Sequence, residues 1–476
     1  ICSMKHIILA GAAFAALTTN AMTTSPMISD GMVLPQNTHA HIWGSANPGE
    51  TIKVSPTWDK QTYSIKADNS GHWLISVATP AASYSQHDLI ISSKTDSDTI
   101  KNVLIGEVWL ASGQSNMEMP LKGFPGCNVK NGFKEIAKAR QYADKVRFYT
   151  VPTSQSYEPV ENANAHWTVP GPDTTPEYSA TAWYFATRLN DVLDIPIGIV
   201  SAAYGGSKVE SWLPREILEK YSDVSLNPKD IEDMTSYWRP MLMYNAMFKP
   251  INKYTYNGII WYQGCSNVSS YDTYADRLVT MVNRWREELG RGDIPFYAVE
   301  IAPYEYDDPA EDGKSPMLRE AQWEAVARLN NADMICTNDI VEEYERFNIH
   351  PGNKEAVGQR LGDVALNKTY GKKQFMAGSP KYKSYRVEGD KIMVAIDSPN
   401  HGICRNYDIK GFEIAGEDGK YYPAKEVIFL WQTNEFQLSN PDVPNPVSAR
   451  YGYGDFMPGN VYGGNYLPLI PFTTKR

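Results

Sequence analysis

Residues 108–117 read VWLASGQSNM, an apolar run followed at once by a polar loop. The apolar half is typical of a buried strand, and the glycine and polar residues after it mark the point where a strand ends. A serine at such a corner can be held exposed and rigid, as a nucleophile must be. The stretch therefore predicts a strand that leads into a candidate catalytic serine, Ser115.

The same order of apolar run and polar loop recurs along the middle of the chain. Segments with the 3.6-residue period of helices separate these runs, for example the one that places Leu278, Val282 and Leu289 on one face. Strands that alternate with helices predict a parallel sheet covered by helices on both faces. In such sheets, ligands bind beyond the carboxyl ends of the strands. The runs are residues 197–201, 258–262, 296–301 and 334–337.

The flanks of this α/β region have a different pattern. One hydrophobic core rarely serves more than about 250–300 residues, so a chain of 476 residues is expected to form several domains. Residues 22–102 alternate short β-prone runs with turn residues, which predicts a small β-sandwich. We expect the α/β domain over residues 103–377 and a β-rich region over residues 378–476. The sequence leaves open where this last region packs.

A histidine late in the α/β region can act together with Ser115. It lies in Asn348-Ile349-His350-Pro351, which follows the last strand-like run of that region. A histidine that folds back onto a serine can take the proton of its hydroxyl as a general base. We therefore predict that Ser115 is the nucleophile and His350 the general base of an acyl-transfer reaction.

Two further loops carry candidate donors for a developing oxyanion. Gly205 and Gly206 follow one strand-like run, where glycines let the backbone approach a ligand and direct an N–H at it. Asn267 follows another run and can aim its side-chain amide at the same point. We predict an oxyanion hole made by the N–H of Ser115, the N–H of Gly206 and the amide of Asn267, with Gly205 as the alternative to Gly206.

Together these segments resemble the sialate O-acetylesterase family, which belongs to the SGNH hydrolase superfamily. The resemblance rests on four motifs in the same order, and it extends to stretches near both ends of the chain. The motifs are GQSNMEMP at residues 113–120, GGSKVESW at 205–212, WYQGCSN at 261–267 and IHP at 349–351; the outer stretches are residues 31–34, 105–110, 411–419 and 467–472.

The resemblance implies an SGNH (flavodoxin-like) parallel-sheet hydrolase core. It also implies a serine esterase that removes O-acetyl groups from carbohydrate through an acyl-enzyme on Ser115, with O-acetylated sialic acids as the leading substrate. No cofactor is expected. From the motif positions we assign substrate contacts to Gln114, Asn116, Gly205, Glu210 and Trp212.

Two positions depart from the motifs. Cys265 stands where the sialate O-acetylesterase family usually has Glu, and Phe347 stands where SGNH hydrolases often have the Asp that orients the histidine. Asp339, at the end of the preceding strand-like run, is the leading candidate to orient His350. The alternatives are Glu342, Glu343 and a Ser–His dyad without a carboxylate.

Cys265 also invites the hypothesis of a crosslink. Cys127 lies in the loop after the predicted nucleophile, and we expect this loop and the loop of Cys265 to converge on the site. Disulfides form in oxidising compartments. We therefore hypothesise a Cys127–Cys265 disulfide that braces the oxyanion loop, with two free thiols as the alternative.

The start of the chain predicts export. A short basic start at Met4-Lys5-His6, an apolar stretch over residues 7–17 and small residues before a cleavage point near Ala21 predict a signal peptide over residues 1–21. No later run reaches the roughly 20 apolar residues that a membrane-spanning helix needs. We expect an exported protein, periplasmic or extracellular.

Charge and motif content argue against several other classes. The formal net charge is −10 and the chain has no Lys/Arg run, so nucleic-acid binding is unsupported. His166, His350 and His401 lie far apart, and no paired metal-ligand spacing occurs, so no metal site is predicted. No glycine motif for a nucleotide is present. The sequence carries no signal for an oligomeric state.

Three alternatives to a sialate esterase stay open. They are an esterase of xylan or another plant glycan on the same scaffold, a non-catalytic glycan-binding protein, and a lipid esterase, although the chain lacks an apolar lid-like segment. Pocket chemistry separates the first from a sialate esterase, because a sialic acid carboxylate favours Arg or Lys partners and a neutral xylan chain favours aromatic platforms. The candidate cations are Lys208, Arg239 and Arg319.

Overall fold

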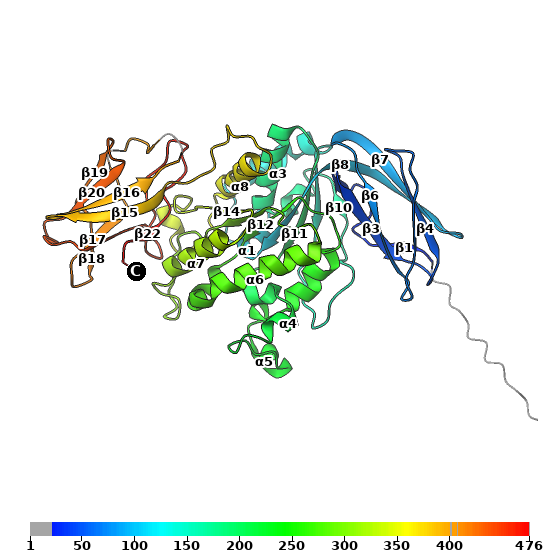
Figure 1. Ribbon diagram of the computed structural model, residues 1–476, viewed down its shortest axis with the longest axis horizontal. Helices are drawn as coiled ribbons and strands as arrows, with labels where there is room; N and C mark the ends of the chain where they lie inside the picture. Colours follow the sequence, from blue (N-terminus) through cyan, green and yellow to red (C-terminus); the bar gives the residue numbers. More distant parts are fainter. Residues whose placement is uncertain (1–20, 400–401, 407, 476) are drawn as a thin grey trace, which may run out of the picture.

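The computed structural model describes residues 21–399, 402–406 and 408–475. Along the long axis lie an N-terminal β-region, a central α/β region and a C-terminal β-region (Figure 1). The two β-regions lie at opposite ends, so the C-terminal one packs on the α/β region and not on the N-terminal one. The predicted signal peptide over residues 1–21 falls outside the described residues, apart from Ala21.

The central region is built on a mostly parallel sheet. Six strands run parallel to their neighbours, and only the short β10 is antiparallel to the strand beside it. In spatial order the strands are β10 (Trp167–Thr168), β9 (Val146–Thr150), β11 (Ile197–Ala203), β8 (Ser97–Gly113), β12 (Gly258–Tyr262), β13 (Phe296–Val299) and β14 (Ala332–Ile335).

The order of these strands differs in one respect from the flavodoxin-like sheet that we expected. Counted along the chain from β8, the parallel strands lie in the order 2-3-1-4-5-6, whereas a flavodoxin-like sheet has 2-1-3-4-5. The difference arises because β11 occupies the edge of β8 and β9 pairs beyond it. The chain still crosses from one side of β8 to the other between β11 and β12, which places a topological switch point there.

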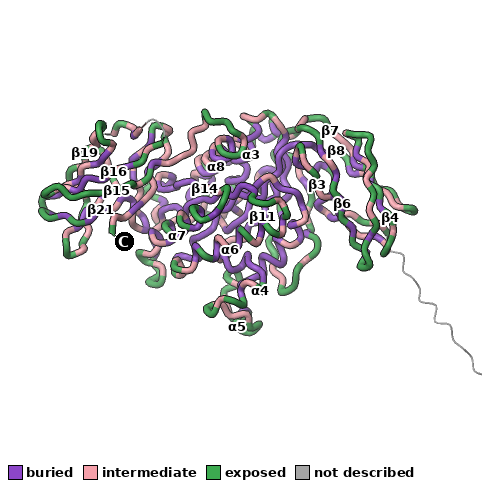
Figure 2. The backbone as a smooth tube through the Cα atoms, viewed as in Figure 1, coloured by how far each residue is buried: buried purple, intermediate pink, exposed green. Residues whose placement is uncertain are grey.

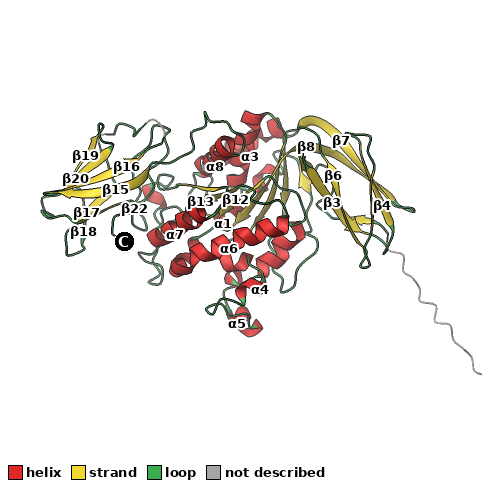
Figure 3. Cartoon of the chain, in the orientation of Figure 1, coloured by secondary structure: helices red, strands yellow, loops and turns green. Residues whose placement is uncertain are grey.

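Two long helices cover each face of this sheet (Figure 3). Helices α3 (Ala180–Leu193) and α8 (Lys354–Lys368) pack on one face, and α6 (Tyr271–Leu289) and α7 (Ser315–Arg328) pack on the other. In β12, Ile260 and Tyr262 belong to the apolar core on the side of α3 and α8, and Ile259 and Trp261 belong to the core on the side of α6 and α7. A strand buried on both faces must be apolar at every position, which is why it appears as an unbroken apolar run in the sequence.

Strand β8 joins the N-terminal and central regions. Its first half pairs with β7 (Ser83–Ser92) and β2 (Val33–Pro35), and its second half pairs with β11 and β12. Every residue from Val103 to Gly113 is buried, and the strand runs through the purple interior of Figure 2. The boundary that we expected between residues 102 and 103 thus lies inside a single continuous strand.

The N-terminal region is a β-sandwich. A three-stranded sheet packs against a second layer of strands that includes the first half of β8. Alternate residues of both layers, such as Ile52, Val54, Ile75 and Val77, point into the core between the two layers. The three-stranded sheet contains β1 (Thr23–Thr24), β3 (His39–Ser45) and β6 (His72–Ala78), and the facing layer adds β4 (Thr51–Pro56) and β5 (Tyr63–Lys66) to β2, β7 and β8.

The C-terminal region has two four-stranded antiparallel sheets around a separate apolar core. Asp455 attaches it to the central region, because its carboxylate accepts hydrogen bonds from Ser315 Oγ at 2.6 Å and Gly313 N at 2.7 Å. One sheet contains β15 (Lys381–Glu388), β16 (Lys391–Asp397), β20 (Glu435–Ser439) and β19 (Glu426–Leu430); the other contains β18 (Tyr421–Pro423), β17 (Phe412–Ala415), β21 (Ser448–Tyr451) and β22 (Phe472–Thr473).

Short helices fill the loops at the carboxyl edge of the central sheet and the loops that follow them. The α-helices are α1 (Ser115–Glu118), α2 (Gly132–Lys138), α4 (Arg215–Leu218) and α5 (Pro228–Asp233). The 3₁₀ and π turns are η1 (Ala139–Tyr142), η2 (Thr175–Glu177), η3 (Val209–Trp212), η4 (Ser236–Trp238), η5 (Tyr244–Phe248), η6 (Lys249–Ile251), η7 (Cys265–Ser270) and η8 (Glu343–Glu345).

We predict that Gly106→Ala destabilises the fold. A Cβ at Gly106 would lie 2.0 Å from the carbonyl oxygen of Pro196, so the shared strand β8 or the chain before β11 would have to move. Such overpacking costs roughly 1–3 kcal/mol. Thermal unfolding should show a lower Tm than in Gly171→Ala, where the nearest atom would lie 3.8 Å away. Equal Tm values for the two variants would contradict the prediction.

Candidate active site

A cavity of about 410 Å³ opens where β8, β11 and β12 end. Ser115 follows β8, Gly205 and Gly206 follow β11, and His350 comes from the loop before α8; all four line this cavity. A Cβ on Gly205 would lie 3.5 Å from the Cβ of Ser115, so the first two loops are in contact. The structure therefore brings most of the predicted catalytic residues to one place.

The backbone at the end of β8 holds Ser115 in a fixed position. Gly113 has φ +140°, and a Cβ there would lie 2.2 Å from the carbonyl oxygen of Tyr262, so only glycine fits. Gln114 N donates to that same carbonyl oxygen at 2.9 Å. The Gln114 side chain, assigned to the substrate from the sequence, accepts a hydrogen bond from Gly264 N at 2.8 Å and so ties the serine loop to the β12 loop.

Asn116 connects the serine loop to the histidine loop. It is buried, and its Nδ2 donates to the carbonyl oxygen of Ile349 at 3.0 Å. Its Oδ1 accepts a hydrogen bond from Lys354 Nζ at 2.7 Å, and Lys354 also donates to the carbonyl oxygen of Pro351 at 2.7 Å. One amide and one ammonium group therefore hold the residues on both sides of His350 against the loop that carries Ser115.

The imidazole of His350 has neighbours that the sequence did not predict. Its Nδ1 lies 3.9 Å from Cys127 Sγ, and the Phe124 ring packs edge-on against it with centroids 5.3 Å apart. Asn348 Oδ1 accepts hydrogen bonds from both the His350 backbone N–H, at 3.0 Å, and the Cys127 thiol, at 3.3 Å. Within the described residues His350 and Ser115 share no hydrogen bond. Catalytic hydrogen bonds of this kind often become short only when substrate binds.

Burial, together with the smaller effect of the positive charge of Lys354, lowers the pKa of His350 to about 4. Burial likewise lowers the pKa of Lys354 to about 7. Both causes act against the imidazolium, because a charged ring would lose water and face a nearby cation. At neutral pH His350 is therefore uncharged, which is the form that can accept a proton.

Two backbone N–H groups in the cavity lining are available for an oxyanion. Those of Ser115 and Gly206 have no hydrogen-bond partner in the part of the chain that the structure describes. Gly206 has φ +75°, a conformation that favours glycine. The N–H of Gly205 is not available, because it donates to Glu118 Oε2. Of the two glycines that we considered, only Gly206 has its N–H free within the described chain.

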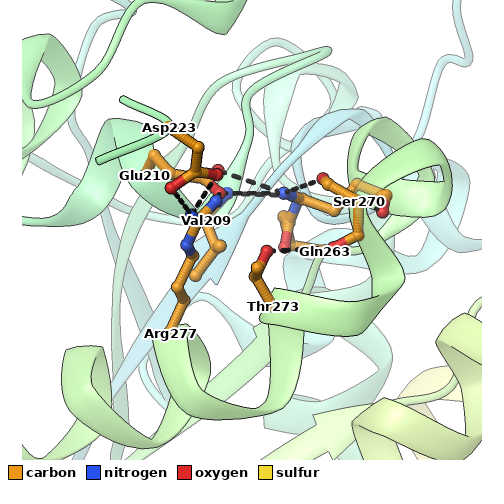
Figure 4. A network of polar contacts seen from close by, with 8 residues as sticks. Val209, Glu210, Asp223, Gln263, Ser270, Thr273 and Arg277 are labelled. Carbon is orange, nitrogen blue, oxygen red and sulfur yellow. Dashed lines mark hydrogen bonds and ion pairs between the residues drawn. The ribbon is translucent and has the colours of Figure 1, made fainter. Parts of the chain in front are cut away.

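The geometry contradicts the prediction that Asn267 is an oxyanion donor. Asn267 is fully buried, and its Nδ2 donates to Glu210 Oε2 at 3.0 Å while its Oδ1 accepts hydrogen bonds from Val209 N and Gln263 Nε2. Figure 4 shows the network to which these contacts belong, in which Glu210 and Asp223 both pair with Arg277. Asn267 is committed there because a buried carboxylate such as Glu210 requires hydrogen-bond donors.

Glu210 and Trp212 were expected to contact substrate, and they too lie outside the cavity lining. Trp212 is fully buried, its Nε1 donates to Ser207 Oγ at 3.0 Å, and its ring packs edge-on against Trp261 and Trp285. This part of the GGSKVESW motif therefore supports the Gly205–Gly206 turn from behind. The Trp212 side chain thus packs and forms its hydrogen bond inside the protein.

The prediction that Asp339 orients His350 is also contradicted. Both oxygens of Asp339 accept hydrogen bonds from Arg360 of α8, each at 2.7 Å. The alternative carboxylates are occupied as well, since Glu342 caps η8 and Glu343 pairs with Arg346. Among the described residues no carboxylate forms a hydrogen bond with His350, and Cys127 takes the place beside its Nδ1.

The hypothesis of a Cys127–Cys265 disulfide is wrong in this structure. Both cysteines are free, as are Cys336 and Cys404, the other two in the described chain. Cys127 lies beside His350, whereas Cys265 is buried in the cavity lining, and burial raises the pKa of the Cys265 thiol to about 11. The loops converge as expected, but the side chains reach different parts of the site.

Comparison with known proteins identifies the family. The family model described as carbohydrate esterase, sialic acid-specific acetylesterase matches residues 105–367. The chain belongs to this family. It is therefore a carboxylic ester hydrolase, as the motifs indicated.

The esterase is similar over most of its length to curated and solved proteins. A sialate O-acetylesterase of Homo sapiens is 26% identical over 423 residues, covering 82% of this chain and 79% of the relative. One of Mus musculus is 26% identical over 516 residues, covering 94% and 93%. The crystal structure of a carbohydrate acetylesterase from Xanthomonas citri superposes on this structure with a TM-score of 0.84 at 28% sequence identity. The match covers 96% of this chain and 100% of that chain.

Several residues around Ser115 and His350 were not predicted from the sequence. They come from loops and short 3₁₀ turns, where neither hydrophobic period nor turn chemistry indicates which way a side chain points. Lys354 differs from the others because it lies at the start of a helix, α8, four residues after His350. Nothing in the sequence shows that it is buried. The other missed residues in contact with the site are Phe124, Cys127, Tyr237, Trp238, Tyr304, Tyr306, Asp307 and Glu311.

Membrane insertion by a helix finds no support in the described residues, where no helix combines the length and apolar character needed to cross a bilayer.

We predict that all four described cysteines react with an alkylating reagent under denaturing, non-reducing conditions, because none is paired in the structure. Mass spectrometry of the digested protein should find the peptides of Cys127 and Cys265 alkylated to the same extent with and without prior reduction. A crosslinked Cys127–Cys265 peptide that disappears on reduction would contradict the structure.

Proposed function

We propose that this chain is a carbohydrate O-acetylesterase with an SGNH hydrolase core, in which Ser115 forms an acetyl-enzyme and His350 is the general base. The observation that carries the proposal is the meeting of Ser115, His350 and the unpaired N–H of Gly206 in one cavity beyond the ends of β8 and β11. The names of the human and mouse relatives and of the Xanthomonas citri structure all describe removal of acetyl groups from carbohydrates, which supports the same reaction.

In the first half of the reaction, Ser115 Oγ attacks the acetyl carbonyl carbon while His350 takes the hydroxyl proton. The carbonyl oxygen becomes an oxyanion, and the N–H groups of Ser115 and Gly206 stabilise it. Each such donor contributes roughly 10²–10³ in turnover. The bond to the sugar oxygen then breaks, His350 returns the proton to that oxygen, and the acetyl group stays on Ser115.

In the second half, water replaces the sugar. His350 takes a proton from the water as its oxygen attacks the acetyl carbon, and the bond to Ser115 Oγ breaks with return of the proton to the serine. Acetate leaves and the free enzyme is restored. The uncharged state of His350 at neutral pH suits both steps, because each begins with proton transfer to the ring.

The catalytic unit is a Ser–His dyad whose histidine is positioned by the backbone of its own loop. Asn348 fixes the His350 backbone N–H, and Asn116 and Lys354 hold the residues on either side. These contacts supply the orientation that a triad carboxylate supplies elsewhere. A dyad is one of the alternatives that the sequence leaves open, and the ion pair of Asp339 with Arg360 favours it.

We further propose that the esterase is exported to the periplasm or the extracellular space, on the basis of the signal-like segment at residues 1–21. A sandwich over residues 22–102, the catalytic domain over 103–377 and a β-rich region over 378–476 remain our proposed division, with β8 shared between the first two. Names of relatives point to O-acetylated sialic acids; xylan or another plant glycan is the other substrate class.

We predict that Ser115→Ala and His350→Ala each lower the rate of acetate release by at least about 10³-fold, because each removes one half of the dyad. Circular dichroism and Tm should match the wild type, since Ser115 and His350 are only partly buried. Asp339→Asn is the matched control at a residue first assigned to the triad.

Asp339→Asn should keep turnover within about tenfold of the wild type, because Asp339 contacts Arg360 and not His350. A loss as large as that of His350→Ala would instead restore Asp339 to the catalytic unit. Near-normal turnover of Ser115→Ala would reject the mechanism.

We predict that the acid limb of the pH profile, where kcat/KM falls as the pH is lowered, has its midpoint near pH 4 and not near pH 6.5. The reason is that the pKa of His350 is lowered to about 4. Lys354→Met should move this limb to higher pH. Lys354, with its pKa lowered to about 7, is charged throughout the window in which His350 titrates, so its removal favours the imidazolium.

The exposed Lys134→Met is the control for this prediction and should leave the limb in place. A purely structural role of Lys354 would lower kcat without moving the limb. A wild-type limb near pH 6.5 would contradict the uncharged state of His350.

A further inference from the structure

The walls of the cavity around Ser115 have a distinct chemistry that bears on the substrate. Beside the residues of the serine, glycine, β12 and histidine loops they contain aromatic rings and carboxylates, and no described residue that lines the cavity is Arg or Lys. The aromatic residues are Tyr237, Trp238, Tyr304 and Tyr306, and the acidic ones are Asp307 and Glu311.

The first aromatic pair adjoins the proposed oxyanion hole. Tyr237 and Trp238 lie on η4 with ring centroids 5.8 Å apart, and both remain more than a third exposed, at 39% and 38%. A Cβ on Gly206 would lie 2.5 Å from Tyr237 Cδ2, so the Tyr237 ring covers the turn that carries the free N–H. A sugar whose acetyl group reaches that N–H would therefore lie beside these rings.

The second aromatic pair comes from the loop after β13. The rings of Tyr304 and Tyr306 meet at right angles with centroids 4.8 Å apart. Exposed aromatic faces bind the apolar C–H faces of sugar rings, and such stacking requires no charge on the sugar. Tyr306 is only 5% exposed and packs against the half-buried Tyr304, so Tyr304 joins Tyr237 and Trp238 as the platform that we expected for a neutral glycan.

The charges of the lining disfavour an anionic sugar. Asp307 and Glu311 add negative charge to the cavity, and burial together with neighbouring Asp308 raises the pKa of Glu311. A substrate carboxylate would bring another negative charge to this site, which is repulsive in a cleft that water only partly screens. His350 offers no compensation, since its pKa is lowered.

None of the three cations that we considered for sialic acid lines the cavity, although Lys208 interacts with two of its wall residues. Lys208 Nζ lies 4.7 Å above the Trp238 ring, and its charge lowers the pKa of Glu311. Arg319 is buried and donates to the carbonyl oxygens of Ile301 and Asp455. Arg239 donates to the carbonyl oxygen of Glu232 and does not line the cavity.

We infer that this esterase deacetylates uncharged pyranose units of an acetylated polysaccharide and discriminates against sialic acid. The inference rests on the proposed function, since it names the substrate of the same Ser115 site. It departs from the names of the curated relatives, because it follows the wall residues and those lie outside the shared motifs.

The test measures kcat/KM for acetate release from acetylated xylan oligosaccharides and from O-acetylated sialic acid side by side. 4-Nitrophenyl acetate reports on the chemistry alone, and Ser115→Ala is the blank. We expect at least about a tenfold preference for the neutral sugar. Equal or greater activity on sialic acid overturns the inference while leaving the esterase mechanism in place. Activity on none of the three substrates rejects the proposed function itself.

Charge removal at the cleft probes the repulsion directly. The double variant Asp307→Asn with Glu311→Gln should raise kcat/KM for O-acetylated sialic acid by about tenfold and change the neutral substrate less. Asp312→Asn, an exposed carboxylate outside the lining, is the matched control and should raise neither. An unchanged preference in the double variant would overturn the electrostatic part of the inference.

Removal of an aromatic ring probes the platform. Trp238→Ala should raise KM for xylan oligosaccharides by about tenfold with a smaller change in kcat, since stacking binds the ground state and transition state alike. Trp431→Ala is the matched control, because Trp431 is 51% exposed but lies in the C-terminal region. An equal KM in Trp238→Ala and wild type would overturn the role of the platform.

Discussion

A buried ammonium group holds the two halves of this active site together. Lys354 has no exposed surface, and its Nζ donates to the side chain of Asn116 and to the backbone carbonyl of Pro351. Burying a charge is costly unless it gains compensating hydrogen bonds, so these contacts are strongly constrained in geometry. Asn116 extends the link by donating to the backbone on the other side of His350. The position of the histidine relative to Ser115 therefore depends on the start of α8, and the charge of the same ammonium adds to the effect of burial in lowering the pKa of the imidazole.

The loop motifs serve two tasks that sequence alone does not separate. In the serine loop, residues on the cavity side are Ser115 and Gln114, while Asn116 faces the interior and positions the histidine loop. In the double-glycine loop, Gly206 reaches the cavity and Trp212 supports it from behind. In the β12 loop, Cys265 and Ser266 line the cavity, and Asn267 donates a hydrogen bond to the buried Glu210. Each motif thus contains residues that line the cavity and residues that support them from the interior, which explains why Asn267 and Trp212 were predicted to be site residues.

The overall architecture was largely predictable, and its exceptions have physical causes. Apolar runs that alternate with helical periods predicted the parallel sheet, because strands buried on both faces and amphipathic helices leave different periodicities. The proposed boundary between residues 102 and 103 falls inside β8, because a strand that passes from one sheet into another shows no break in its apolar pattern. The strand order was missed for a related reason, since pairing partners far apart in sequence leave no local trace.

The sequence by itself determined the fold class and predicted that Ser115, His350 and the glycine turn share one site, because these depend on local backbone conformation and on short motifs. Only the tertiary structure decided which groups surround them. Asp339 pairs with Arg360, and Asn267 donates a hydrogen bond to Glu210. Cys127 lies beside the imidazole nitrogen where a carboxylate was expected. The wall of rings and acids around Ser115 is likewise assembled from loops that are distant in the chain. Such neighbours follow from long-range packing and the competition of buried charges for partners, which no local pattern records.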